Sequence, residues 1–185
     1  MRVISGSARR LPLKTPEGMD TRPTQDRIKE TLFNMLQSDI PGCRFLDLFA
    51  GSGAIGIEAL SRGASEAVFM ENNPKAAAVI RDNLHSTRLE ENARVLQGDL
   101  FSLLPAEACR SEVYDIIFMD PPYRHDYEKK VLELLQDSSL ADSYTLIIVE
   151  ASLDTPFDYL EDLGYDLVRE KKYKTNKHVF IRKRS

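Results

Sequence analysis

Residues 45–56 read FLDLFAGSGAIG, a short apolar run followed by a glycine turn and the start of an apolar helix. Glycine allows a tight turn and lets a ligand come close to the backbone. The free N–H groups at the start of a helix then favour a nucleotide-like ligand. Read loosely, Gly51, Gly53 and Gly56 also fit the G-x-G-x-x-G spacing of dinucleotide sites, with Glu71 placed where such a site has a ribose-binding acid.

On both sides of this stretch, apolar or β-branched runs alternate with helical patterns, which predicts βα units and a parallel sheet. We expect strands at residues 44–49, 67–70, 93–97, 114–119 and 145–150, and helices at 24–37, 54–61, 74–87 and 127–136. From residue 165 onward the pattern changes to alternation around Thr175-Asn176, which predicts an antiparallel hairpin. The sequence therefore predicts an α/β, Rossmann-like fold.

Length and composition favour one globular domain. The chain has 185 residues, of which 42% are hydrophobic and 29% charged, so we expect a single domain over residues 1–185 whose first 38 residues form a basic arm and a helix. No apolar stretch approaches the roughly 20 residues that cross a bilayer, and no signal peptide is visible, so we expect a cytoplasmic protein without membrane contact. Cys43 and Cys109 lack any CxxC partner, which excludes a thiolate zinc site. We therefore expect no metal site.

The net charge of −4 is unevenly distributed. Residues 1–30 carry +3, residues 169–185 carry +7, and the segment between them carries −14. Basic ends are typical of a protein that touches phosphates, although a solvated tail without a role is the alternative. The candidate phosphate contacts are Arg9, Arg10, Arg22, Lys171, Lys172 and Lys174.

An aspartate inside the first strand narrows the choice of ligand. Asp47 places a carboxylate beside the glycine turn. That charge repels a pyrophosphate and attracts a ligand with sulfonium and ammonium groups, which favours S-adenosylmethionine over NAD. The alternative is that Asp47 only caps the turn.

Two further acids follow the next two strands. Glu71 can accept both hydroxyls of a ribose, and Asp99 can accept from an adenine amino group. The alternatives are a surface acid for Glu71 and a helix cap for Asp99. Three acids at the carboxyl ends of three successive strands nevertheless fall where open α/β sheets bind their ligands.

The strand expected at 114–119 ends in Asp120-Pro121-Pro122-Tyr123. Two consecutive prolines remove two N–H donors and stiffen the chain. The carboxylate of Asp120 and the carbonyl of Pro121 can each accept one hydrogen of a nucleobase amine, and Tyr123 offers a face for the base to stack on. A turn that merely follows a strand is the alternative.

Taken together, these motifs resemble the class I methyltransferases that modify exocyclic amines and carry an (Asp/Asn)-Pro-Pro-aromatic motif. Residues 2–6 (RVISG) and 21–24 (TRPT) further resemble the bacterial family that methylates N2 of a guanine in 16S small-subunit ribosomal RNA. The resemblance covers essentially the whole chain. It implies a seven-stranded, mostly parallel sheet with a C-terminal antiparallel hairpin, and action on partly assembled small subunits, with a monomeric enzyme expected.

The same resemblance implies the residues of the site. The S-adenosylmethionine pocket is expected to include Asp47, Phe49, Ala50, Gly51, Gly53, Glu71, Asn72, Asp99 and Leu100. The acceptor base is expected at Asp120, Pro121, Pro122 and Tyr123. Rival readings are an adenine-N6 or cytosine-N4 nucleic-acid methyltransferase, an NAD-binding oxidoreductase, and a non-catalytic RNA-binding protein.

Overall fold

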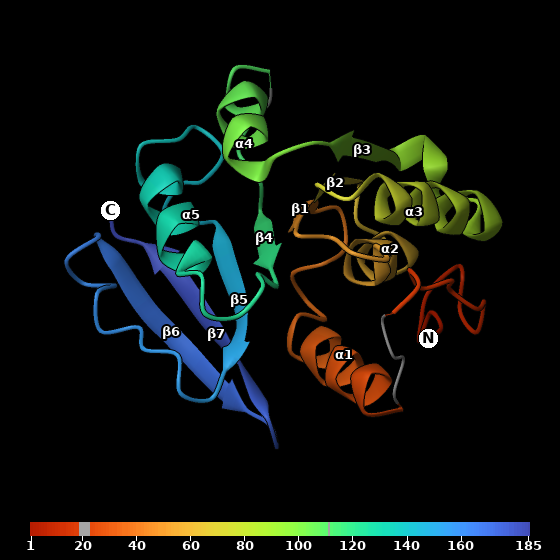
Figure 1. Cartoon of the computed structure of the whole chain (residues 1–185), viewed down its shortest axis with the longest axis horizontal. Helices are drawn as coiled ribbons and strands as arrows, with labels where there is room; N and C mark the ends of the chain where they lie inside the picture. Colours follow the sequence, from red (N-terminus) through yellow and green to blue (C-terminus); the bar gives the residue numbers. More distant parts are fainter. Residues whose placement is uncertain (19–22, 111) are drawn as a thin grey trace. The chain divides into compact units, whose positions relative to one another are not determined.

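The strands in the described part of the chain form a mixed sheet of seven, in the order β3-β2-β1-β4-β5-β7-β6 (Figure 1). This computed structural model describes residues 1–18, 23–110 and 112–185. The predicted α/β class and the C-terminal antiparallel hairpin are confirmed. The chain divides into two compact units, residues 1–100 and 101–185, which are described in turn.

The first unit is a parallel three-stranded arrangement with helices. Its elements are α1 (Pro23–Met35), β1 (Arg44–Leu48), α2 (Ala54–Ser61), β2 (Glu66–Glu71), α3 (Pro74–Thr87), η1 (Glu90–Asn92) and β3 (Ala93–Gln97). β2 pairs with β1 on one side and with β3 on the other. The helix α2 packs on β1 and β2, and it is buried along almost its whole length. The helix α3 begins where Asn73 accepts backbone N–H groups and Pro74 presets the first turn.

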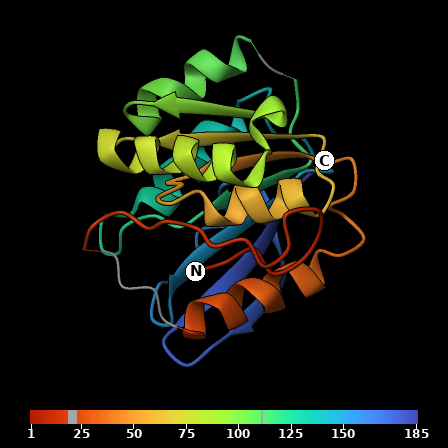
Figure 2. The ribbon, with the colours of Figure 1, turned by 90° about the vertical axis from the view of Figure 1, so that its right-hand side faces the viewer.

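Residues 1–14 pack against the rest of the first unit. A bridge pairs Arg2 with Pro12, and the Ser7 N–H donates to the Ser61 carbonyl of α2 at 2.8 Å. Figure 2 shows this N-terminal segment running beside α2. Gly6 has a φ of +89°, and a Cβ added there would lie 1.8 Å from the Ser61 carbonyl oxygen. Only glycine fits at this contact.

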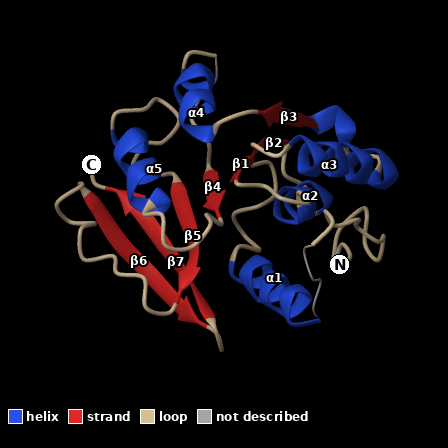
Figure 3. Cartoon of the chain, in the orientation of Figure 1, coloured by secondary structure: helices blue, strands red, loops and turns tan. Residues whose placement is uncertain are grey.

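The second unit contains the four remaining strands, which are drawn in red in Figure 3. Its elements are α4 (Leu100–Ala108), which begins at the boundary, then β4 (Ile116–Met119), α5 (Tyr127–Gln136), β5 (Leu146–Ser152), β6 (Tyr165–Lys172) and β7 (Asn176–Lys183). β4 and β5 are parallel, whereas β7 is antiparallel to both β5 and β6. None of the described helices has the length and apolar character needed to cross a membrane.

Several elements begin or end one or two residues away from the expected bounds, and two differences have a physical reason. The helix α4 was not expected, because Pro105 lies inside it and interrupts the helical pattern. The strand expected from residue 114 begins two residues later. Tyr114 instead donates its N–H to the Leu140 carbonyl and its hydroxyl to Glu107 at 2.6 Å, so it is buried outside the strand ladder.

Candidate active site

The glycine turn, residues 49–53, links β1 to α2 through strained backbone. Phe49 has a φ of 58°, a backbone conformation that residues other than glycine rarely adopt. Gly51 and Gly53 have φ of 57° and 76°. Such strain is concentrated at functional sites. A Cβ at Gly53 would lie 3.0 Å from Ile80, so the turn also packs closely on α3.

Asp47 lies in β1 directly beneath this turn and is almost fully buried. Its Oδ2 accepts the Gly56 N–H at 3.0 Å, which fixes the start of α2. Burial raises the pKa of Asp47 well above its usual range, and the charge of Glu71 adds to the shift, while the Gly56 hydrogen bond opposes it. A cationic ligand beside Asp47 would favour its ionised form.

Glu71 ends β2 and holds the glycine turn from the neighbouring strand. Its Oε2 accepts the Gly51 N–H and its Oε1 accepts the Asn73 N–H, both at 2.8 Å. Each oxygen of a carboxylate has a second lone pair, so the fixed carboxylate can still receive the two hydroxyls of a ribose. The residues present therefore fit S-adenosylmethionine: a diol acceptor, an acid for the cation and a glycine backbone.

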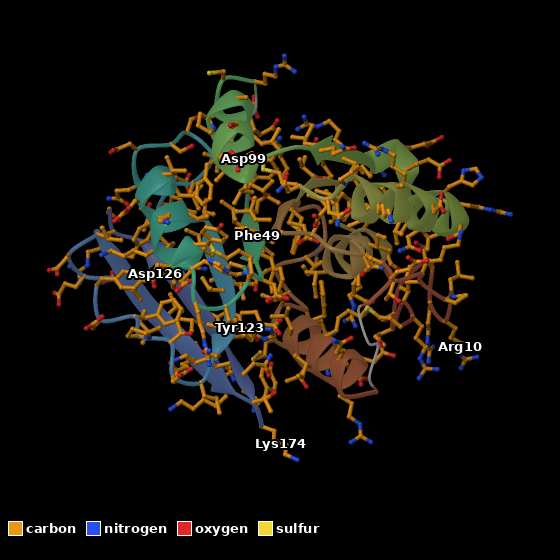
Figure 4. The ribbon with its side chains drawn as sticks, viewed as in Figure 1. Arg10, Phe49, Asp99, Tyr123, Asp126 and Lys174 are labelled. Atoms are coloured by element: carbon orange, nitrogen blue, oxygen red, sulfur yellow. The ribbon has the colours of Figure 1, made fainter. Side chains whose placement is uncertain are left out.

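The loops after the three parallel strands of the first unit meet at one edge. The Ala50 N–H donates to the Met70 carbonyl, and the Gly98 N–H donates to the Glu71 carbonyl, each at 3.0 Å. Asn72 is exposed on this edge, and Asp99 follows β3 immediately before Leu100 opens α4. Figure 4 labels Phe49 and Asp99. The structure thus brings together the predicted cofactor residues that follow β1, β2 and β3.

The proline corner, residues 120–123, leaves the carboxyl end of β4 in the second unit. Pro121 is buried, while Asp120 and Pro122 are exposed and Tyr123 is 48% exposed. Partial burial raises the pKa of Tyr123 to about 12, and the charges of Asp120 and Glu150 contribute. The phenol therefore stays neutral at physiological pH and presents an uncharged ring for stacking.

Comparison with known proteins places the chain in a family. The family model described as "Conserved hypothetical protein 95" matches residues 1–182. The chain belongs to this family. Ribosomal RNA small subunit methyltransferase D of Escherichia coli is 38% identical over 154 residues, which is 83% of this chain and 76% of that protein. The YlbH protein of Bacillus subtilis is 40% identical over 172 residues, 93% of this chain and 92% of YlbH. The solved structure of yhhF from Escherichia coli superposes with a TM-score of 0.83 at 32% identity, covering 100% of this chain and 98% of that one.

The sequence-based reasoning missed the cluster that fixes the N-terminal segment of this family member. Glu58 of α2 is fully buried and accepts the N–H groups of Ile4 and Ser5 at 2.9 and 3.0 Å. It also pairs with Lys29 at 3.3 Å and with Arg62 at 2.8 Å. Burial lowers the pKa of Lys29, and the charge of Glu58 opposes that shift. An acid in the otherwise apolar helix AIGIEALS was the available signal.

The candidate RNA contacts lie in both units of the chain. Arg9 and Arg10 are exposed on the N-terminal segment, and Lys174 is exposed at the turn between β6 and β7 (Figure 4). Lys171 is partly exposed in β6, and the neighbouring Lys172 pairs with Glu170 at 3.3 Å. Arg22 lies outside the described residues.

Proposed function

We propose that this protein transfers a methyl group from S-adenosylmethionine to the exocyclic N2 amine of a guanine in 16S small-subunit ribosomal RNA. One observation carries the proposal: the proline corner ends β4 in a chain that aligns over most of its length with ribosomal RNA small subunit methyltransferase D. That corner has the acceptors and the ring that an aromatic amine needs.

The first unit is proposed to bind the cofactor. Glu71 holds the ribose hydroxyls, Asp99 accepts from the adenine amine, and Asp47 provides the negative charge beside the glycine turn. Phe49, Ala50, Asn72 and Leu100 complete the pocket. When bound, S-adenosylmethionine supplies an electrophilic methyl group on a sulfonium.

The second unit is proposed to bind the acceptor base. The Asp120 carboxylate and the Pro121 carbonyl accept the two hydrogens of the amine, which turns its lone pair outward. Pro122 keeps the corner rigid, and Tyr123 stacks on the base. Aromatic amines are weak nucleophiles, so the corner contributes this orientation, and the proton released on methyl transfer goes to the Asp120 carboxylate or to water.

The proposal also covers partners and organisation. The basic residues named above, Arg22 included, contact RNA phosphates, so binding should weaken as salt rises. The substrate is the RNA within a small-subunit particle or assembly intermediate, and the enzyme acts in the cytoplasm as a monomer. Residues 1–185 act as one methyltransferase domain.

The test is methyl transfer with labelled S-adenosylmethionine to ribosomal RNA and to small subunits from cells that lack the gene. Digestion to nucleosides and mass spectrometry should show N2-methylguanosine, and mapping gives the modified position. Methylated adenine or cytosine would replace the guanine assignment with a rival one. Binding of NAD in place of S-adenosylmethionine, measured by calorimetry, would remove the methyltransferase proposal.

A matched pair of variants tests the cofactor half. Glu71→Ala should weaken S-adenosylmethionine binding at least about tenfold, because the ribose loses a charged acceptor. Glu66→Ala, at the other end of the same strand, removes a carboxylate that pairs with Arg44 and Arg94 and should leave the affinity unchanged. Equal affinities in the two variants would contradict the role of Glu71.

A further inference from the structure

Glu150 is a second carboxylate beside the proline corner. The parallel register of β4 and β5 pairs Met119 with Val149, so Asp120, which directly follows β4, and Glu150 of β5 come next along the two neighbouring segments. Burial raises the pKa of Tyr123, and both carboxylates add to that shift. The side chain of Glu150 is 20% exposed, so it is mostly enclosed yet reachable.

Two donors from β7 hold the Glu150 carboxylate in place. His178, which pairs with Glu150 across the antiparallel ladder, has its Nε2 3.1 Å from Oε2. Asn176 donates from Nδ2 to Oε1 at 2.7 Å. Because a carboxylate only accepts, the proton of a neutral His178 is on Nε2. The Nδ1 atom is then an acceptor, and the Tyr173 hydroxyl donates to it at 3.0 Å.

We infer that Glu150 accepts the N1–H of the target base and so selects guanine among bases that carry an amine. This inference rests on the proposed function and adds the residue that reads the base. In guanine, a ring N1–H donor lies next to the N2 amine. If Asp120 and Pro121 hold the N2 amine, the N1–H beside it needs an acceptor next to the proline corner. Glu150 on the neighbouring strand β5 is such an acceptor.

The negative charge of Glu150 is what makes the site select guanine over other purines that carry an amine. A purine with an amine beside an unprotonated N1 presents a lone pair there, which a carboxylate repels. A site built to accept a hydrogen discriminates strongly against a base that presents a lone pair there, because the carboxylate then faces that lone pair and makes no bond to the base. Both oxygens already receive hydrogen bonds, so Glu150 is held in place as an acceptor.

The test compares guanine with 2,6-diaminopurine at the nucleotide mapped above, in whichever RNA or particle the guanine form is methylated. Both bases carry the 2-amine, but diaminopurine has no N1–H and carries a 6-amine in place of the 6-oxygen, so the Glu150→Gln variant is needed to assign the difference to N1. Wild-type protein should prefer guanine by at least about 50-fold in kcat/KM. In Glu150→Gln the amide can donate to N1, so the preference should fall below about fivefold and the rate on diaminopurine should rise.

The structure can accommodate Glu150→Gln. Asn176 Oδ1 is buried, and no donor among the described residues bonds to it. A rotated Asn176 amide can therefore accept from the new amide while His178 donates to its oxygen. The matched control is Glu161→Gln, which removes an exposed carboxylate of the same unit and should keep the wild-type preference.

The outcomes separate the inference from the function it rests on. If wild-type protein methylates neither base, the proposed function fails. If it methylates guanine and diaminopurine equally, or if Glu150→Gln keeps the full guanine preference, only the role of Glu150 is overturned. If Glu150→Gln does not fold, equal rates of the wild-type protein on the two bases still overturn the role of Glu150.

Discussion

Replacing Glu58 by alanine should release the N-terminal segment from α2. The change deletes the acceptor of two backbone N–H groups and leaves Lys29, which is 4% exposed, without its carboxylate. Removing one partner of a buried ion pair costs about 3–5 kcal/mol. Since a domain of this kind is stable by about 5–15 kcal/mol, we expect a loss of about 4 kcal/mol and a large drop in the urea midpoint.

The pH dependence of this loss follows from Lys29. Burial already lowers its pKa, and removing Glu58 takes away the main charge that opposes the shift. In the variant, the unfolded chain therefore binds more protons than the folded one at alkaline pH, so stability rises with pH. The deficit should narrow as the pH rises toward the ordinary lysine value of 10.5.

Urea unfolding followed by circular dichroism measures the loss, and trypsin cleavage after Arg9 and Arg10 reports release of the segment. The control is Glu66→Ala, whose ion pairs with Arg44 and Arg94 are partly exposed and are worth about 1 kcal/mol or less. A loss for Glu58→Ala as small as that of the control, with no faster cleavage, would refute the reasoning.

Three other variants test the site. Asp47→Asn keeps an acceptor for the Gly56 N–H but removes a buried charge. Burial raises the pKa of Asp47, so the wild-type protein loses stability as the pH rises through that raised value. The variant should lack this loss when unfolding is measured across pH. It should also bind S-adenosylmethionine about tenfold more weakly by calorimetry. Gly56→Ala places a Cβ 2.4 Å from the Phe69 ring and should cost about 1–3 kcal/mol in thermal unfolding; an unchanged melting temperature would contradict the packing. Asp120→Ala should retain cofactor affinity within about twofold while methyl transfer falls about 10²–10⁴-fold, and wild-type turnover would disprove its role.

Local sequence patterns were sufficient for most of the fold. The helices expected at 54–61, 74–87 and 127–136 have those bounds in the structure, because glycine, proline and apolar spacing mark their ends. The helix α4 could not be predicted in the same way. Pro105 lies within its first two turns, and only the packing of the surrounding chain shows that the helix continues past it.

The residues of the candidate site also divide into those that local sequence patterns predict and those that only the folded chain brings together. Asp47, Glu71 and Asp120 each follow or lie near the end of a recognisable strand, so the place of each within its own unit could be predicted. Glu150 also ends an apolar run, but its partner His178 comes from β7, and only the antiparallel register brings the two together. The pairing of distant strands is not encoded in local periodicity, so this contact required the structure.

The position of β7 has a consequence for synthesis. This strand lies between β5 and β6 in the sheet, yet it is the last strand in the sequence. While the chain emerges from the ribosome, all strands of the first unit are made early. The edge of β5 stays uncovered until its neighbour β7 is made. Exposed strand edges favour association with other chains. Newly made second units are thus most prone to aggregation just before residues 176–183 emerge.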